Sequence, residues 1–176
     1  MTYSILLAGF GGQGLLFAGK QLAMCAMNNN LNVTWLPSYG PEMRGGTANC
    51  SVIISDEPVG SPLVTNPDIL IAMNLPSYEK FEKAIVPGGT LICDSTLVNV
   101  KSHRTDINAY YLPATALADE NNLKGLANVI MLGKLLKISG IFDKDVFGKS
   151  MTQHIPESKA HLAAANLKAL EIGFNA

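Results

Sequence analysis

Short apolar runs, each bounded by turn-forming residues, recur along the first two thirds of the chain. They are too short for helices and are flanked by Gly, Pro, Asn and Asp, which is typical of strands. The runs are Ser4–Ala8, Val33–Leu36, Ser51–Ser55, Ile69–Met73, Thr90–Cys93 and Ala109–Leu112. This pattern predicts a sheet of about six strands.

Apolar residues at helical spacing fill several of the intervals between these runs. The predicted helices are Gln13–Asn28, Ser77–Ile85, Ala127–Ile138 and Lys159–Ile172, the last of them ended by Gly173. Strands that alternate with helices predict a mostly parallel sheet with both faces covered. We therefore expect a Rossmann-like α/β fold of three layers, α/β/α, in a single domain of residues 1–176.

One connection departs from this alternation. The residues between Leu36 and Ser51 include two prolines and three glycines, so a crossover helix is not expected there. Residues 48–55 should then run antiparallel to their neighbours, and the proline-rich stretch 56–67 can return the chain without a helix. The sheet is accordingly predicted to be mixed.

The composition points to a protein that is partly covered by another subunit. Apolar residues make up 48% of the chain and charged residues only 15%, with a mean hydropathy of +0.21. So little polar surface favours subunit contacts, and a homodimer when the chain is isolated. The chain has thirteen basic and fourteen acidic residues and no basic run. This charge pattern does not predict binding to nucleic acid or to a membrane surface. With no recognisable signal peptide or membrane span, a cytoplasmic location is expected.

Potential metal ligands are few and scattered. Cys25, Cys50 and Cys93 form no C-x-x-C pair, so neither a zinc site nor an iron–sulfur cluster can be built from their spacing. Buried free thiols are the expected outcome. His154 and His161 are separated by Pro156 and are expected to be surface or packing residues. We therefore expect this chain to bind no metal by itself.

A glycine-rich segment follows the first predicted strand. Its sequence, GFGGQG at 9–14, matches the G-x-G-x-x-G pattern that places a phosphate at a helix N-terminus. Gly11, Gly12, Gln13 and Gly14 are therefore candidates for binding an anion or a nucleotide; the alternative is a tight turn without a ligand. An NAD site also needs an acidic residue about twenty positions later. Residues 29–36 contain none, which disfavours an NAD enzyme.

Polar residues and glycines also gather where other predicted strands end, which is where open α/β sheets bind their ligands. The segment 35–47 combines the only Trp with Tyr, Glu, Arg and a Gly-Gly pair, and is either a packed lid or a recognition loop. In a recognition loop, Arg44 would bind a phosphate or a carboxylate. The further candidate binding residues are Ser38, Tyr39, Glu42, Arg44, Gly45, Gly46 and, after another strand, Asn74. No residue is assigned a catalytic role.

Segments along nearly the whole chain resemble the gamma subunit of 2-oxoacid:ferredoxin (acceptor) oxidoreductases. The most specific is VTWLPSYGPEMRGGTANCSVIIS at 33–55, which accompanies GFGGQG. Shorter matches are PDILIAMN at 67–74, VPGGTLICDSTL at 86–97, PATALA at 113–118, ANVIMLG at 127–133 and NLKALEIG at 166–173. PSYGPEMRGGTANC is similar to the 2-oxoglutarate form, whereas pyruvate-type subunits tend to carry an arginine-doubled, alanine-proline version.

The resemblance implies a cytoplasmic complex that decarboxylates a 2-oxoacid oxidatively, forms its coenzyme A thioester and reduces ferredoxin or flavodoxin. This chain lacks the Gly-Asp-Gly…Asn type of motif for thiamine diphosphate. Thiamine diphosphate, Mg and the iron–sulfur clusters would thus lie on partner subunits, namely alpha, beta and a ferredoxin-like delta. The role left for this chain is to close the active site and contact coenzyme A, without turnover of its own. A self-contained nucleotide-binding oxidoreductase and a pure scaffolding subunit remain as alternatives.

Overall fold

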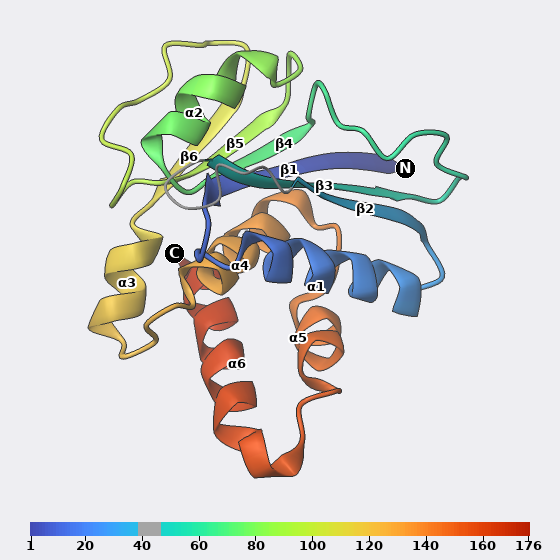
Figure 1. The fold of residues 1–176 in the computed structure, drawn as a ribbon, viewed down its shortest axis with the longest axis vertical. Coiled ribbons are helices and arrows are strands. Elements are labelled where there is room, and N and C mark those ends of the chain that lie inside the picture. Colours follow the sequence, from blue (N-terminus) through green and yellow to red (C-terminus); the bar gives the residue numbers. More distant parts are fainter. Residues whose placement is uncertain (39–46) are drawn as a thin grey trace.

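A six-stranded sheet forms the centre of the protein, in a computed structural model that describes residues 1–38 and 47–176 (Figure 1). The strands lie in the order β2-β3-β1-β4-β5-β6. Their bounds are Thr2–Phe10 for β1, Asn32–Ser38 for β2, Thr47–Ser55 for β3, Ile69–Ala72 for β4, Thr90–Asp94 for β5 and Asn108–Leu112 for β6. Each contains or overlaps one of the apolar runs, so the predicted strands are confirmed.

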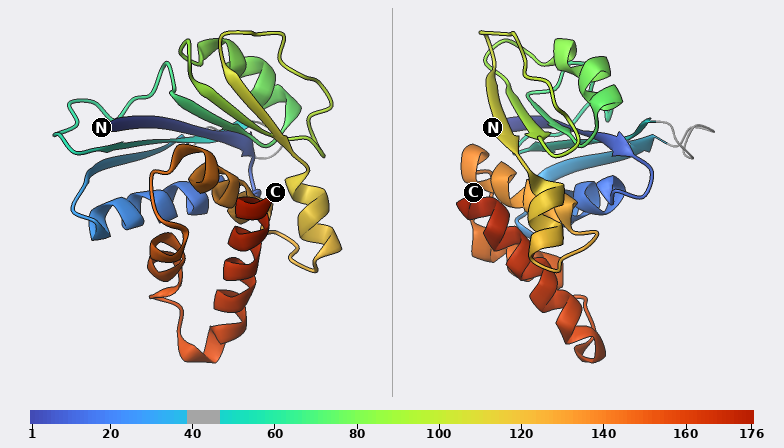
Figure 2. Two further views of the ribbon diagram at one scale, coloured as in Figure 1. Left: turned by 180° about the vertical axis from the view of Figure 1, so that it is seen from behind. Right: turned by 90° about the vertical axis from the view of Figure 1, so that its left-hand side faces the viewer.

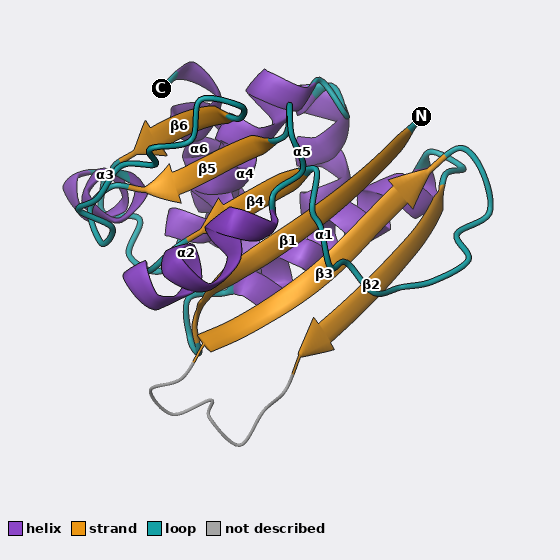
Figure 3. Cartoon of the chain, turned by 90° about the horizontal axis from the view of Figure 1, so that it is seen from above, coloured by secondary structure: helices purple, strands orange, loops and turns teal. Residues whose placement is uncertain are grey.

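The sheet is mixed, as the loop between β2 and β3 predicted. Strands β1, β4, β5 and β6 are parallel to one another, whereas β3 pairs antiparallel with both β1 and β2. In the common doubly wound order, 3-2-1-4-5-6, the second and third strands are joined by a crossover helix. Here they form an antiparallel pair, which places β3 next to β1 and leaves β2 at the edge of the sheet (Figure 3).

One face of the sheet carries most of the helices (Figures 1 and 2). These are α1 (Leu15–Asn28), α4 (Ala127–Ser139), α5 (Lys144–Thr152) and α6 (Ala160–Asn175), with the short 3₁₀ turn η2 (Glu157–Lys159) before α6. The larger hydrophobic core lies between them and the sheet and includes Ile5, Leu22, Ile71, Ile130 and Phe147. This burial holds the start of α1 firmly against the carboxyl end of β1.

The opposite face has a thinner cover. Helix α2 (Leu75–Phe81) and the 3₁₀ turn η1 (Glu82–Ala84) lie over it, and a smaller core that includes Leu6, Leu70, Tyr78 and Leu91 lies beneath them. Helix α3 (Ala114–Glu120) follows β6 beside the sheet. The predicted three-layer α/β architecture is confirmed, with layers of unequal thickness. Helices α3 and α5 were not delimited by the apolar periodicity, because both are short.

The predicted end of the last helix is wrong. Helix α6 continues through Gly173 to Asn175, because this glycine lies at the crossing with α4 and does not cap the helix. A Cβ atom at Gly173 would overlap the carbonyl of Ile130, and one at Gly133 would overlap the carbonyl of Leu170. The two glycines therefore allow α4 and α6 to approach with their backbones in contact.

The starts of α1 and α2 also differ from the prediction by two residues each. Helix α1 begins at Leu15 because Gly14 adopts the left-handed conformation, with φ 75°. Helix α2 begins at Leu75 because the side chain of Asn74 accepts a hydrogen bond from the backbone N–H of Ser77 and caps the helix. Both helices start at the edge of the sheet where the parallel strands end.

Candidate functional site

The candidate site lies at the carboxyl ends of β1, β4 and β5 (Figure 3). After β1 the chain passes to α1 on one face, and after β4 it passes to α2 on the opposite face. The two connections therefore diverge between neighbouring parallel strands. Open α/β sheets bind their ligands at this kind of switch point.

The glycine-rich turn follows β1 directly. Gly12 and Gly14 have positive φ angles, 94° and 75°, which only glycine adopts without strain. No side chain caps α1, so the N–H groups of its first turn and the positive end of its dipole face the switch point. The arrangement is suited to an anion, as the sequence pattern predicted.

The side chain of Gln13 has a structural role. Its Oε1 accepts a hydrogen bond from the backbone N–H of Phe10 at 2.6 Å, and its Nε2 donates to the carbonyl of Met73 at 2.8 Å. Gln13 thereby ties the ends of β1 and β4 together. Of the predicted residues in this turn, Gln13 positions the backbone, while Gly12 supplies the open space next to it: no atom lies within 4 Å of a Cβ placed there.

Asn128, on the first turn of α4, supports the turn from the other side and was missed by the sequence analysis. Its Nδ2 donates to the carbonyl of Gly14 at 2.9 Å, while its buried Oδ1 has no partner among the described residues. A Cβ at Gly14 would overlap this amide. The sequence feature that could have identified Asn128 is its place as the single polar residue within the apolar run ANVIMLG, where a helix face that only packs against the core would carry an apolar residue.

Asn74, another predicted binding residue, lies after β4 on the far side of the switch point. Its Oδ1 caps α2 through Ser77, so this atom is engaged. Its Nδ2 and the hydroxyl of Ser77 are buried without partners among the described residues. A buried hydrogen-bond donor without a partner lowers the stability of the fold. These two groups at the edge of the sheet therefore destabilise the protein.

Asp94 lies at the end of β5, one of the polar strand ends that the sequence indicates, although it was not among the predicted binding residues. Its carboxylate is fully buried and accepts hydrogen bonds from the backbone N–H of Thr96, and from both the N–H and the hydroxyl of Thr115. The Thr115 hydroxyl lies 2.6 Å from Oδ2 of Asp94. Asp94 therefore fixes the start of α3 relative to β5, and with it one wall of the site.

A cavity of about 280 Å³ opens beside the glycine-rich turn. Its wall includes Gly12 and Gln13 from the turn, Met73 from the end of β4, and Thr115, Lys124 and Gly125 from α3 and the loop that follows it. Lys124 adds an exposed positive charge that the sequence analysis did not single out. The cavity thus combines an uncapped helix start, glycine backbone and one cation, Lys124, with one carboxylate, Asp119, on the wall formed by α3. The helix start and Lys124 are the groups suited to a phosphate-bearing ligand.

The remaining predicted residues are placed only in part. Ser38 is the last residue of β2, whose carboxyl end lies at the same edge as that of β1, so the structure brings Ser38 to the site's side of the sheet. Tyr39, Glu42, Arg44, Gly45 and Gly46 lie outside the described residues. Gly11 lies in the turn and is exposed.

The three thiols are free and buried, as predicted. Burial raises the pKa of Cys25 to about 11, and the pKa values of Cys50 and Cys93 to about 12. The three cysteines lie on separate elements, α1, β3 and β5, and are not gathered as the ligands of one iron–sulfur cluster. Across residues 1–38 and 47–176, no group of three or more His, Cys, Asp or Glu side chains is placed to hold a metal ion.

We expect the native thiols to resist a disulfide reagent at pH 8, where fewer than about one in a thousand is ionised. All three should react once the chain is unfolded.

Because unfolded thiols ionise near pH 9 and the native ones only near 11 to 12, the native state holds more protons than the unfolded state between these pH values. The free energy of unfolding should therefore fall as the pH rises above 9. Rapid labelling of the native protein at pH 8 would contradict the burial of the thiols, and a free energy of unfolding that does not fall above pH 9 would contradict their raised pKa values.

A comparison with known families decides the relationship of this chain. Residues 4–176 match the model of the pyruvate ferredoxin/flavodoxin oxidoreductase family. The chain belongs to this family. The resemblance identified from the motifs is thereby confirmed, and in the described ranges no helix is long and apolar enough to cross a membrane.

Members of the family with curated names support a gamma-type subunit. The chain is 36% identical to the 2-oxoglutarate synthase subunit KorC of Methanocaldococcus jannaschii, an alignment that covers 99% of this chain and 93% of KorC. It is 37% identical to the ketoisovalerate oxidoreductase subunit VorA of Methanothermobacter thermautotrophicus, covering 96% of this chain but 35% of VorA. The chain thus spans about a third of the length of that relative.

Two solved structures share the fold. The gamma subunit of a keto/oxoacid ferredoxin oxidoreductase from Geobacter sulfurreducens superposes with a TM-score of 0.83 at 30% identity, covering 98% of this chain and 96% of that subunit. The 2-oxoglutarate:ferredoxin oxidoreductase from Magnetococcus marinus, with 2-oxoglutarate, coenzyme A and succinyl-CoA bound, superposes with a TM-score of 0.87 at 25% identity. The match covers 99% of this chain and 30% of the Magnetococcus chain.

Proposed function

We propose that this chain is the non-catalytic gamma subunit of a thiamine-dependent 2-oxoacid:ferredoxin or acceptor oxidoreductase, in which it closes the active site and contacts coenzyme A. The observation that carries the proposal is the cavity beside the uncapped start of α1, with Lys124 on its wall. Coenzyme A carries a diphosphate and a further phosphate. Helix N–H groups and a lysine are the partners that such groups select.

The proposed substrate is 2-oxoglutarate. KorC supports this choice because the alignment covers nearly all of both chains. VorA, at a similar identity, makes ketoisovalerate the competing substrate. Decarboxylation and electron transfer are assigned to alpha, beta and ferredoxin-like delta subunits, because the sequence lacks the thiamine diphosphate motif and its three cysteines lie apart, on α1, β3 and β5. The electrons would then pass to ferredoxin or flavodoxin.

Exposed apolar side chains support contact with other subunits. On α1, Phe17 and Met27 are 41% and 64% exposed, and Trp35 on the edge strand β2 is 36% exposed. Trp35 lies close to Gly19 of α1, so the edge strand packs against this helix. Aromatic and methionine side chains in such positions are typical of interfaces.

The deciding experiment measures steady-state kinetics of the complex reconstituted with its companion subunits. Replacing Lys124 by alanine should raise the KM for coenzyme A about tenfold, the effect of losing one charge-assisted hydrogen bond, and leave the KM for the 2-oxoacid unchanged. Arg44→Ala should act in the same direction. Lys83→Ala, which removes an exposed charge from η1 on the other face of the sheet, serves as the matched control.

The same assay separates the alternatives. Turnover with 2-oxoglutarate should exceed turnover with 2-oxoisovalerate or pyruvate, and the isolated chain should have none. If Lys124→Ala and Arg44→Ala assemble normally and keep wild-type coenzyme A kinetics, the chain has a scaffolding role. A failure of Arg44→Ala to assemble would make its loop a subunit interface.

A further inference from the structure

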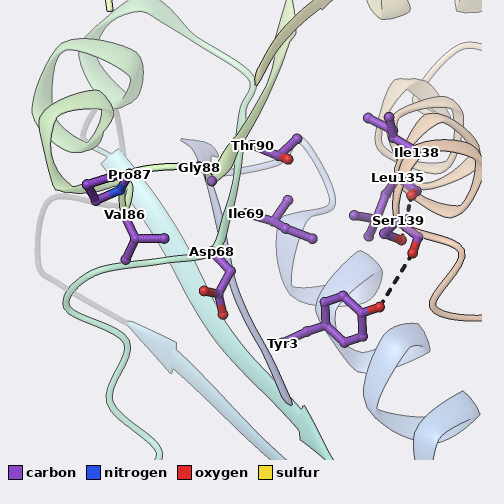
Figure 4. Close-up of a pocket in the computed structure, with 11 residues that line it drawn as sticks. Tyr3, Asp68, Ile69, Val86, Pro87, Gly88, Thr90, Leu135, Ile138 and Ser139 are labelled. Atoms are coloured by element: carbon purple, nitrogen blue, oxygen red, sulfur yellow. Dashed lines mark hydrogen bonds between the residues drawn. The ribbon is translucent and has the colours of Figure 1, made fainter. Parts of the chain in front are cut away.

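A second cavity lies at the opposite edge of the sheet, where the parallel strands begin (Figure 4). Its volume is about 290 Å³. Tyr3 and Asp68 line it at the start of β1 and just before β4, residues 86–90 line it before and at the start of β5, and the end of α4 forms the opposite wall. This cavity is separate from the glycine-rich turn and has no part in the proposed function.

Asp68 is the charged group of this cavity and is held in a fixed orientation. Its Oδ2 accepts hydrogen bonds from the backbone N–H of Ser4 at 2.8 Å and from the Ser4 hydroxyl at 2.6 Å. Its Oδ1 has no hydrogen-bond or salt-bridge partner among the described residues. A half-buried carboxylate therefore faces the cavity with one oxygen available for a ligand (Figure 4).

The other polar groups around the cavity also favour a positive charge. The carbonyl of Ser139 lies at the end of α4, where the negative end of the helix dipole is located, and accepts a hydrogen bond of 3.4 Å from the Tyr3 hydroxyl. Among the described residues that line the cavity there is no Lys, Arg or His. The walls beside these acceptors are the aliphatic side chains of Ile69, Leu135 and Ile138.

We propose that this cavity binds a cationic group carried on an apolar stem, an ammonium or a guanidinium, with Asp68 Oδ1 as its counter-ion. The stem lies against the aliphatic wall and the charge lies between Asp68 and the end of α4. A cavity of this size accommodates a small organic amine or one basic side chain of another subunit. The two sources share the same chemistry and are separated by the second part of the test.

The first part titrates the isolated full-length chain with n-hexylamine and, separately, with 1-hexanol, following backbone amide signals by NMR. Hexylamine should shift the signals of Gly88, Gly89 and Ser139, and hexanol should bind at least tenfold more weakly. Asp68→Asn should weaken hexylamine binding at least tenfold. Glu57→Gln, which removes an exposed carboxylate elsewhere, should leave it unchanged.

A second variant keeps the test decisive if Asp68→Asn does not fold. Ile138→Trp fills the cavity from a half-exposed position without touching the carboxylate, and should also abolish hexylamine binding. Equal binding of hexanol and hexylamine would overturn the proposal. So would undiminished hexylamine binding to Asp68→Asn or to Ile138→Trp.

The second part uses the complex with the companion subunits and calorimetric titration with hexylamine. If a basic side chain of a partner occupies the cavity, the complex should no longer bind hexylamine there, and Ile138→Trp should weaken assembly at least tenfold. If the natural ligand is a small amine, assembly should be unchanged and the complex should bind hexylamine as the isolated chain does. A complex that neither binds hexylamine nor loses affinity in the variant would overturn the proposal.

Discussion

Replacing Gly173 by alanine is expected to lower the free energy of unfolding by about 3 kcal/mol or more, because the new methyl group has no space. It would overlap the carbonyl oxygen and carbon of Ile130, which are backbone atoms of α4 and cannot rotate away as a side chain would. The two helices would have to separate, and the larger core that they share would lose its packing. Urea unfolding followed by circular dichroism measures the effect.

Gly60→Ala is the matched control. No atom lies within 4 Å of a Cβ at this exposed position, and its φ is not in the left-handed region, so the substitution should change stability by less than about 0.5 kcal/mol. Gly133→Ala, on the other helix of the same crossing, should behave like Gly173→Ala. A Gly173→Ala protein as stable as Gly60→Ala would show that α4 and α6 pack less closely than the structure indicates.

Replacing Gly14 by alanine should have the second largest effect, about 2–3 kcal/mol, from two sources that can be measured separately. The first is the left-handed backbone, with φ 75°. The second is the overlap of the new methyl group with the side-chain amide of Asn128, which is itself hydrogen-bonded to the carbonyl of Gly14. In the reconstituted complex the same variant should also weaken coenzyme A binding, because Gly14 is the N-cap residue of α1.

Gly12→Ala separates the two sources. Gly12 has a φ of 94° but no atom within 4 Å of a Cβ, so its substitution should cost only the backbone strain, about 1–2 kcal/mol. Combining Gly14→Ala with Asn128→Ala should restore part of the loss, because the smaller side chain removes the overlap. If the double variant is destabilised by the full sum of the two single changes, Asn128 does not limit the space at Gly14.

Much of the sheet was predictable because its signals are local. Each strand is a short apolar run between turn residues, and the prolines and glycines between Leu36 and Ser51 exclude a crossover helix whatever surrounds them. From that exclusion the antiparallel direction of β3 follows directly. The glycine-rich turn was recognisable for the same reason, since φ angles such as the 94° of Gly12 and the 75° of Gly14 favour glycine, which is visible in the sequence itself.

The roles of single polar residues in the site were not predictable in this way. Gln13 belongs to a nucleotide-binding pattern, yet its side chain is used to join β1 to β4, sixty residues away along the chain. Asn128 and Lys124 reach the turn from the other end of the sequence. Whether a polar side chain faces a ligand or a neighbouring backbone depends on what the fold places within 3 Å of it, which periodicity does not contain.

The amino-acid sequence by itself determined the strands, the mixed sheet, the turn at Gly12 and Gly14 and the family, because these depend on local backbone preferences and on contiguous motifs. Only the tertiary structure decided the function of Gly173: the same residue ends a helix when solvent surrounds it and continues one when another backbone lies against it. It also decided that Asp68, one of many acidic residues in the sequence, carries a carboxylate oxygen without a described partner inside a cavity. Both outcomes depend on contacts between segments that are distant in the chain.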